Sequence, residues 1–87
     1  MVDPIAQKYA FEEFAKSMIQ NNLHVALERH NLTRSGFAER TGLSKKAVDN
    51  WMQGDCVPSL SKALLICYAN GWKLSELIGG ILDDKKV

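Results

Sequence analysis

The sequence predicts a single all-α domain, and three observations support this. The 87 residues suffice for one hydrophobic core, and the 46% of them that are hydrophobic is an ordinary share for a globular protein. Glycine and proline divide the chain at short intervals, and the segments between them have the length of helices. The sequence has no run of alternating β-branched and polar residues, the pattern typical of a strand. We therefore expect helices joined by short turns.

The first helix is expected to begin at Pro4, because Asp3 can cap its N-terminus and proline is favoured at the first helical position. Hydrophobic residues then recur every three or four positions, which is the period of an amphipathic helix. They are Ile5, Tyr9, Phe11, Phe14, Ala15, Met18 and Ile19. A helical stretch continues over residues 23–30. Asn21 and Asn22 either break the helix or lie within it, and the pattern leaves both open.

Each of the next three helices is expected to lie between a polar N-cap and a glycine. Serine and threonine cap helix N-termini well, and glycine adopts the left-handed conformation that ends a helix. The caps are Thr33, Ser44 and Ser59, and the glycines are Gly42, Gly54 and Gly71. The expected helices cover residues 34–41, 45–53 and 60–70, with a short last helix at 74–78.

One face of the expected helix 45–53 is polar and basic. At about 100° per residue, five polar residues fall within an arc of about 140°. Val48 and Trp51 fall on the opposite side and are expected to face the core. The polar residues are Lys45, Lys46, Asp49, Asn50 and Gln53. Amide side chains can pair with adenine, lysine can reach guanine or a phosphate, and a carboxylate can accept from cytosine.

The positive charge of the chain is concentrated in the same region. Residues 29–54 contain five basic and two acidic residues, a net charge of +3. Residues 1–28 contain two basic and four acidic residues, a net charge of −2, and residues 55–87 are balanced at four of each. Gly42 lies within the positive region, where a tight turn makes two short helices cross steeply. The helix after the turn then has one side available to a partner.

The residues around this turn resemble the lambda-repressor-like helix-turn-helix family of phage repressors, Cro proteins and their bacterial relatives of XRE type. The matching residues are Ala38, Gly42, Val48, Trp51, Gly54, Pro58 and Ser59. They place an alanine in the second helix, a glycine at the turn, a β-branched residue and an aromatic on the third helix, and a Pro-Ser start to the fourth. The likeness covers roughly residues 19–78 and implies five helices, the third of which reads DNA.

The resemblance also implies roles for individual residues. Base contacts are expected from Lys45, Lys46, Asp49 and Asn50, and phosphate contacts from Arg34, Ser44 and Gln53. Arg34 stands where the family usually has a glutamine, so its contact is expected to be to phosphate alone. Gly36 lies inside the second helix, at a cost of about 1 kcal/mol relative to alanine. The expected core positions are Leu23, Ala26, Leu27, Leu32, Phe37, Ala38, Leu43, Val48, Trp51, Leu60, Leu64, Cys67, Leu74 and Leu77.

Residues 1–18 lie outside the shared pattern and are expected to form an amphipathic N-terminal helical extension. The helix-turn-helix domain then covers residues 19–80, and residues 81–87 form a C-terminal tail. The extension either packs on the domain or forms a homodimer contact through Phe11, Phe14 and Met18. Ile81 and Leu82, at the start of the tail, are an alternative contact between two copies.

We therefore expect a sequence-specific DNA-binding transcription regulator, a repressor of phage or bacterial type. It would bind double-stranded DNA as a homodimer on a near-palindromic operator. The alternative is a protein-interaction module of the same fold, such as an antitoxin, an antirepressor or a scaffold, acting through its N-terminal helix. Salt-dependent binding would separate the two, because DNA contacts weaken steeply with salt.

Other classes of function find little support in the sequence. It has no nucleophile–base pair, paired-carboxylate site or phosphate-binding glycine loop, so we expect no enzyme, no small-molecule substrate and no cofactor. Cys56 and Cys67 lack the spacing of a zinc site, and no metal is expected. No apolar run reaches the roughly 18 residues of a membrane span, and no signal peptide is recognised. We therefore expect a cytoplasmic protein without a membrane partner.

Overall fold

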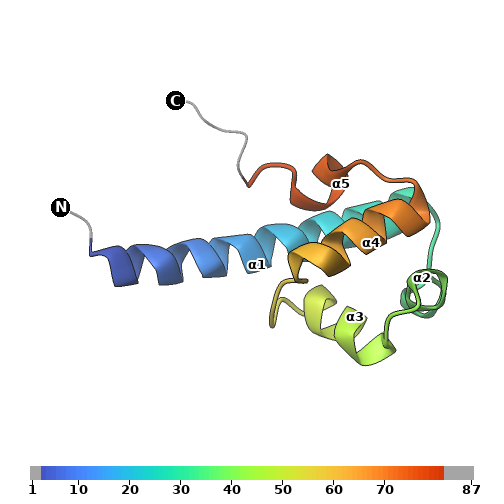
Figure 1. Ribbon diagram of the computed structural model, residues 1–87, viewed down its shortest axis with the longest axis horizontal. Helices are drawn as coiled ribbons and strands as arrows, with labels where there is room; N and C mark the ends of the chain where they lie inside the picture. Colours follow the sequence, from blue (N-terminus) through green and yellow to red (C-terminus); the bar gives the residue numbers. More distant parts are fainter. Residues whose placement is uncertain (1–2, 82–87) are drawn as a thin grey trace.

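The computed structural model describes residues 3–81, which form five helices, four short ones packed against one long one (Figure 1). The helices are α1 (Pro4–Arg29), α2 (Arg34–Thr41), α3 (Lys45–Met52), α4 (Leu60–Asn70) and α5 (Leu74–Ile78). The second half of α1 contacts α3 and α5, while α4 packs on α2 and α5. Within the described residues there is no strand, so the all-α prediction is confirmed for this part of the chain.

The α1 helix is continuous. The Asp3 carboxylate accepts a hydrogen bond from the Ile5 N–H at 3.0 Å, and Pro4 is the first helical residue, as predicted. Asn21 and Asn22 lie within the helix, which settles the alternative that the sequence left open. The helix therefore passes without interruption from the expected N-terminal extension into the expected domain. Asn31, which adopts a left-handed φ of 59°, follows its end.

The predicted caps are confirmed, with one difference at the end of α3. Thr33, Ser44 and Ser59 each accept a hydrogen bond from a backbone N–H of the helix they precede. Gly42 and Gly71 are left-handed C-caps. The α3 helix ends at Met52, one residue earlier than predicted, and Gln53 is its C-cap. Gly54 is still left-handed, at φ 78°, which lets the Asp55 N–H reach back to the Asn50 carbonyl at 3.0 Å.

The core lies between the second half of α1 and the four shorter helices. Most predicted core residues are buried, and Leu32 and Leu43 are partly buried against them. Ile19, Met52, Ala63, Ile66 and Trp72 are buried core residues that the prediction omitted. Trp72 stacks on Phe37 with ring centroids 5.7 Å apart, so an aromatic pair joins α2 to the loop between α4 and α5.

Three predicted core positions are wrong, because Leu60, Leu64 and Leu74 are exposed. In α4, Ala63, Ile66 and Cys67 face the core instead, which turns the helix by about 80° from the predicted orientation. Both faces of α4 are hydrophobic at helical spacing, so the period alone could not select between them. In the short α5, Leu77 occupies the core and Leu74 lies at the surface.

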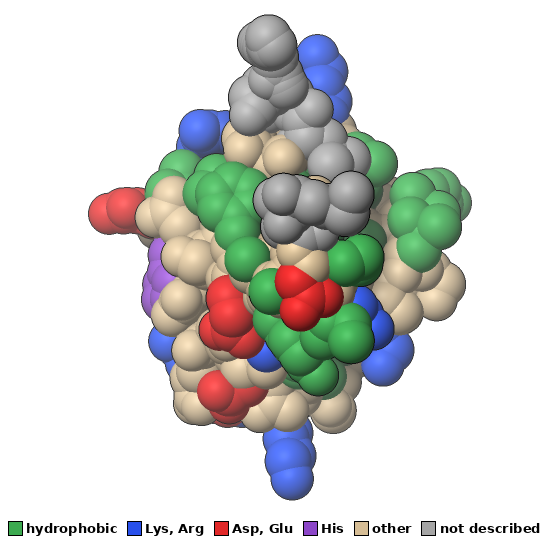
Figure 2. Space-filling view, turned by 90° about the vertical axis from the view of Figure 1, so that its left-hand side faces the viewer, with side chains coloured by type: hydrophobic (Ala, Val, Ile, Leu, Met, Phe, Trp, Pro, Cys, Tyr) green, Lys and Arg blue, Asp and Glu red, His purple; other side chains and the backbone are tan. Residues whose placement is uncertain are grey.

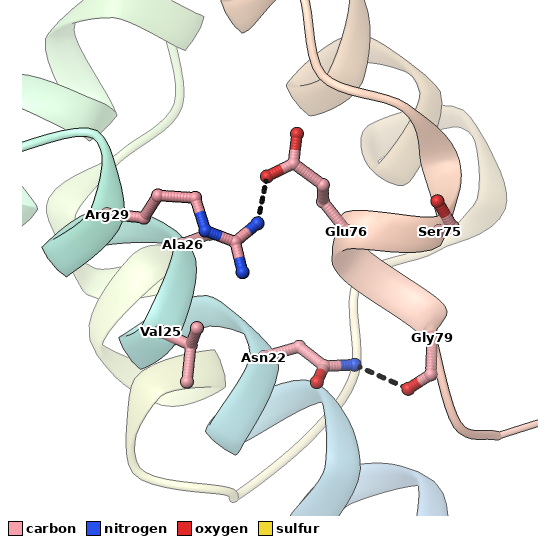
Figure 3. A pocket seen from close by; sticks show the side chains of 7 residues that line it. All are labelled: Asn22, Val25, Ala26, Arg29, Ser75, Glu76 and Gly79. Atoms are coloured by element: carbon pink, nitrogen blue, oxygen red, sulfur yellow. Dashed lines mark hydrogen bonds and ion pairs between the residues drawn. The ribbon is translucent and has the colours of Figure 1, made fainter.

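Polar contacts hold α5 against α1 around a pocket of about 320 Å³ (Figure 3). The Asn22 amide donates to the carbonyls of Leu77 and Gly79, at 2.8 and 3.0 Å. Glu76 forms an ion pair with Arg29 at 3.0 Å and contacts the His30 ring nitrogen at 3.1 Å. The hydrogen bond with His30, with Arg29 adding, holds the pKa of Glu76 below its usual value. These groups pair with each other across the pocket and join the two helices.

The first part of α1, residues 4–14, extends away from the core (Figure 1). We call it the free segment. Near its end, Phe11 and Glu12 line a pocket with the loop residues Asp55, Cys56 and Val57. Every residue of the free segment is exposed, including Ile5, Tyr9, Phe11 and Phe14. Although α1 has 26 residues, none of the helices described for residues 3–81 combines the length and the apolar character required to cross a bilayer.

Candidate nucleic-acid interface

The α2 and α3 helices are joined by a turn of three residues. Gly42 takes the left-handed conformation, at φ 76°, which lets the Leu43 N–H donate to the Ala38 carbonyl at 3.1 Å. Ser44 then caps α3 by accepting from the Ala47 N–H at 3.1 Å. In Figure 1, α2 is seen nearly along its axis whereas α3 runs across the view, so the two helices cross steeply. The turn thus gives α3 one side toward the core and one side outward.

The inner side of α3 is fixed by packing and by two hydrogen bonds. Val48 and Trp51 are buried, as predicted from the helical period, and Met52 is buried with them. The Gln20 amide donates to the Met52 carbonyl at 3.1 Å, and the His24 ring nitrogen lies 3.1 Å from the same oxygen. Gln20 and His24, one turn apart on α1, therefore anchor the last turn of α3. The sequence analysis gave neither residue this role.

The seven predicted DNA-contact residues lie on or next to the outer side of α3. Ser44, Lys45, Lys46 and Gln53 are exposed, and Arg34, Asp49 and Asn50 are half-buried. Within residues 3–81, the side chains of Lys46, Asn50 and Gln53 form no hydrogen bond to another group of the protein. Their polar atoms are available to a ligand.

Asp49 joins two of the predicted basic contacts to each other. One oxygen of its carboxylate accepts from Lys45 Nζ at 3.1 Å, and the other accepts from Arg34 Nη1 at 3.4 Å. The hydrogen bond from Lys45, with Arg34 adding, lowers the pKa of Asp49 below its usual value. A carboxylate expected to meet a base is thus bound within the protein, where it ties the start of α2 to the middle of α3.

Ser44 and the first turn of α3 offer donors to an anion. The Ser44 oxygen accepts from Ala47, which leaves its hydroxyl hydrogen free to donate. The first N–H groups of a helix lack partners in the helix, and the helix dipole is positive there. Lys45 and Lys46 lie in this turn and are exposed. The arrangement can bind a phosphate oxygen.

The predicted dimer residues do not form one surface. Phe11 and Phe14 are exposed in the free segment. Met18 is half-buried, and its methyl group lies so close to Gly80 that a Cβ there would be 2.6 Å from it. Ile81 packs against the core, and Leu82 lies outside the described residues. Phe11 and Phe14 are thus exposed, whereas Met18 and Ile81 contact other parts of the same chain.

The chain was compared with protein-family models, with curated proteins and with solved structures. No family model, no curated protein and no solved structure matched the chain. The features of the described residues that bear on function are the exposed polar side of α3 and the contacts that hold this helix in place.

Proposed function

We propose that the protein is a sequence-specific DNA-binding transcription regulator, a cytoplasmic repressor of the lambda-repressor-like helix-turn-helix type. The observation that carries this proposal is the outer side of α3. There, Lys46, Asn50 and Gln53 form no side-chain hydrogen bond to any described part of the chain, while the buried Val48 and Trp51 pack the opposite side of the helix against the core. A rigid helix with unpaired donors and acceptors on its outer side suits the major groove of DNA, which admits one α-helix.

Six of the seven predicted contact residues bind DNA in this proposal, and Asp49 holds Arg34 and Lys45 in place. The Asn50 amide pairs with an adenine, and Lys45 and Lys46 reach acceptors on guanine or a nearby phosphate. Arg34, Ser44 and Gln53 bind phosphates and so set the position of the helix on the duplex. Two copies bind a near-palindromic operator, with half-sites about 34 Å apart, and repression follows from covering promoter DNA.

The test is binding of duplex DNA selected from a random pool, followed by titration of variants. We expect Asn50→Ala to cost about 1–3 kcal/mol on the preferred duplex and to relax the preference at one base pair. Arg34→Ala should weaken all sequences alike. Asn21→Ala, an exposed amide on α1, is the matched control and should bind as the wild type does. Association with no duplex at low ionic strength would refute the proposal, and an equal Asn50→Ala loss on every sequence would refute base reading by Asn50.

A protein-interaction module is the second candidate, because the free segment exposes Ile5, Tyr9, Phe11 and Phe14. Such a module would bind a protein through hydrophobic contacts. Binding of DNA should weaken steeply as salt rises, because phosphate contacts release counterions, whereas a hydrophobic contact should be nearly insensitive to salt. A salt series on the isolated complex therefore separates the two candidates.

A further inference from the structure

The molecule carries two exposed hydrophobic surfaces. The first is the free segment of α1. The second, which we call the α4 outer face, consists of Leu60, Leu64, Leu65 and Tyr68. The four large side chains of each surface expose between 39% and 88% of their area. Figure 2 looks at the end from which α1 projects and shows several separate groups of hydrophobic side chains at the surface.

The free segment is hydrophobic on two sides. Ile5 and Tyr9 lie one turn apart on one side, and Phe11 and Phe14 lie on roughly the opposite side. A helix that is apolar on opposite sides is usually buried between other elements. The free segment, which has every residue exposed in the single chain, is therefore suited to lie against a second molecule.

We propose that this molecule is a second copy of the chain, in a two-fold dimer in which the free segment of each copy lies on the α4 outer face of the other. The biological role of this dimer rests on the proposed function, but the dimer itself can form and be measured without DNA. In a two-fold arrangement the same pair of surfaces meets twice, so the contact closes on itself as a dimer.

The size of the two surfaces favours this exchange. A large aromatic side chain presents about 150–250 Å². Because the free segment can lay only one of its two apolar sides on the α4 outer face, the exchange covers roughly 600 Å² per copy, within the lower range of what each partner buries in a stable protein pair, out of the order of 800 Å² that the eight side chains together present. Either surface alone presents about half of this area. A dimer that pairs only like surfaces would therefore have a small interface, whereas the exchange covers the α4 outer face and one side of the free segment on each copy.

The charges of the two surfaces also favour the exchange. Residues 3–14 contain Asp3, Glu12 and Glu13 against Lys8, a net charge of −2, and Glu13 pairs with Lys16 at 3.1 Å. Residues 60–70 contain Lys62 as their one charged residue. Two free segments would meet with like charge, as would two α4 outer faces, whereas one of each brings opposite charges together. Neither surface includes a residue of α2 or α3, so both reading helices stay accessible.

The experiment uses reciprocal variants of the whole chain, measured by sedimentation equilibrium without DNA. One variant carries Tyr9→Gln and Phe14→Gln in the free segment, and the other carries Leu64→Gln and Tyr68→Gln on the α4 outer face. All four positions are exposed, so helicity and thermal unfolding should match the wild type. Each variant alone should lose at least about tenfold in dimer affinity. Val25→Gln, an exposed position of α1 outside both surfaces, is the control.

A mixture of the two variants distinguishes the exchange from a dimer that pairs two like surfaces. In each homodimer both contacts contain one changed surface, whereas in the heterodimer one contact is intact and the other contains both changes. Because one changed surface is enough to break a contact, the heterodimer keeps one contact where the homodimers keep none, and the mixture should associate more tightly than either variant alone. A mixture no tighter than its components, or a wild-type chain that stays monomeric, would overturn the exchange. A dimer that binds no DNA would refute only the proposed function, and a DNA-binding monomer would refute only this pairing.

Discussion

At the scale of single residues, the proposed DNA contacts of Arg34 and Lys45 depend on Asp49. Its carboxylate binds both cations, so it limits their freedom and cancels part of their charge. Asp49→Asn should bind random duplexes more tightly, because one negative charge leaves the interface, and should discriminate less between preferred and altered duplexes. Titrations with both kinds of duplex measure this, with Asp55→Asn as the matched control at an exposed carboxylate. Unchanged discrimination would contradict the positioning role.

Gly54 is a second residue whose effect follows from its surroundings. It is left-handed, and a Cβ there would lie 2.8 Å from the Gln20 side-chain oxygen, whereas a Cβ at the left-handed Gly42 would meet nothing within 4 Å. Gly42→Ala should therefore cost about 1–2 kcal/mol for the backbone conformation alone, and Gly54→Ala should cost more. Urea unfolding measures both values. If Gly54→Ala costs no more than Gly42→Ala, the contact with Gln20 is not a constraint.

At the scale of helices, the sequence predicts the boundaries well because capping depends on a few neighbouring residues. Asp3, Thr33, Ser44 and Ser59 all cap the helices expected of them. The orientation of α4 could not be predicted in the same way. Leu60 and Leu64 lie on one hydrophobic face and Ala63 and Ile66 on another, and only packing against α2 and α5 decides which is buried.

In the candidate interface, too, local features could be predicted from the sequence and contacts between distant residues could not. The polar side of α3 follows from helical geometry, and the structure places Val48 and Trp51 opposite it, as predicted. The contacts of Gln20 and His24 with Met52 join residues that are 32 and 28 positions apart, and no local pattern reveals them. The bond of Arg34 to Asp49 likewise depends on how steeply α2 crosses α3.

At the scale of the whole molecule, Glu76 couples the folding of α5 to pH. Because its pKa is lowered in the folded state, its contribution to stability is complete above the unfolded pKa of about 4.3. The contribution is lost as pH falls through the lower folded value. The wild type should thus be more stable than Glu76→Gln at pH 7, and the gap should shrink below about pH 4. Thermal unfolding of both proteins across this range is the measurement, and a gap independent of pH would exclude this coupling.

The uninterrupted course of α1 has a consequence for any assembly built on its projecting end. Adding one residue to a helix advances everything before it by about 100° and 1.5 Å. A hinge between residues 14 and 19 would let the two ends turn independently, but a single helix locks them in phase. The distance and angle between two associated copies would then depend on the number of residues in this part of α1. Each residue inserted or deleted there would change both by a fixed step.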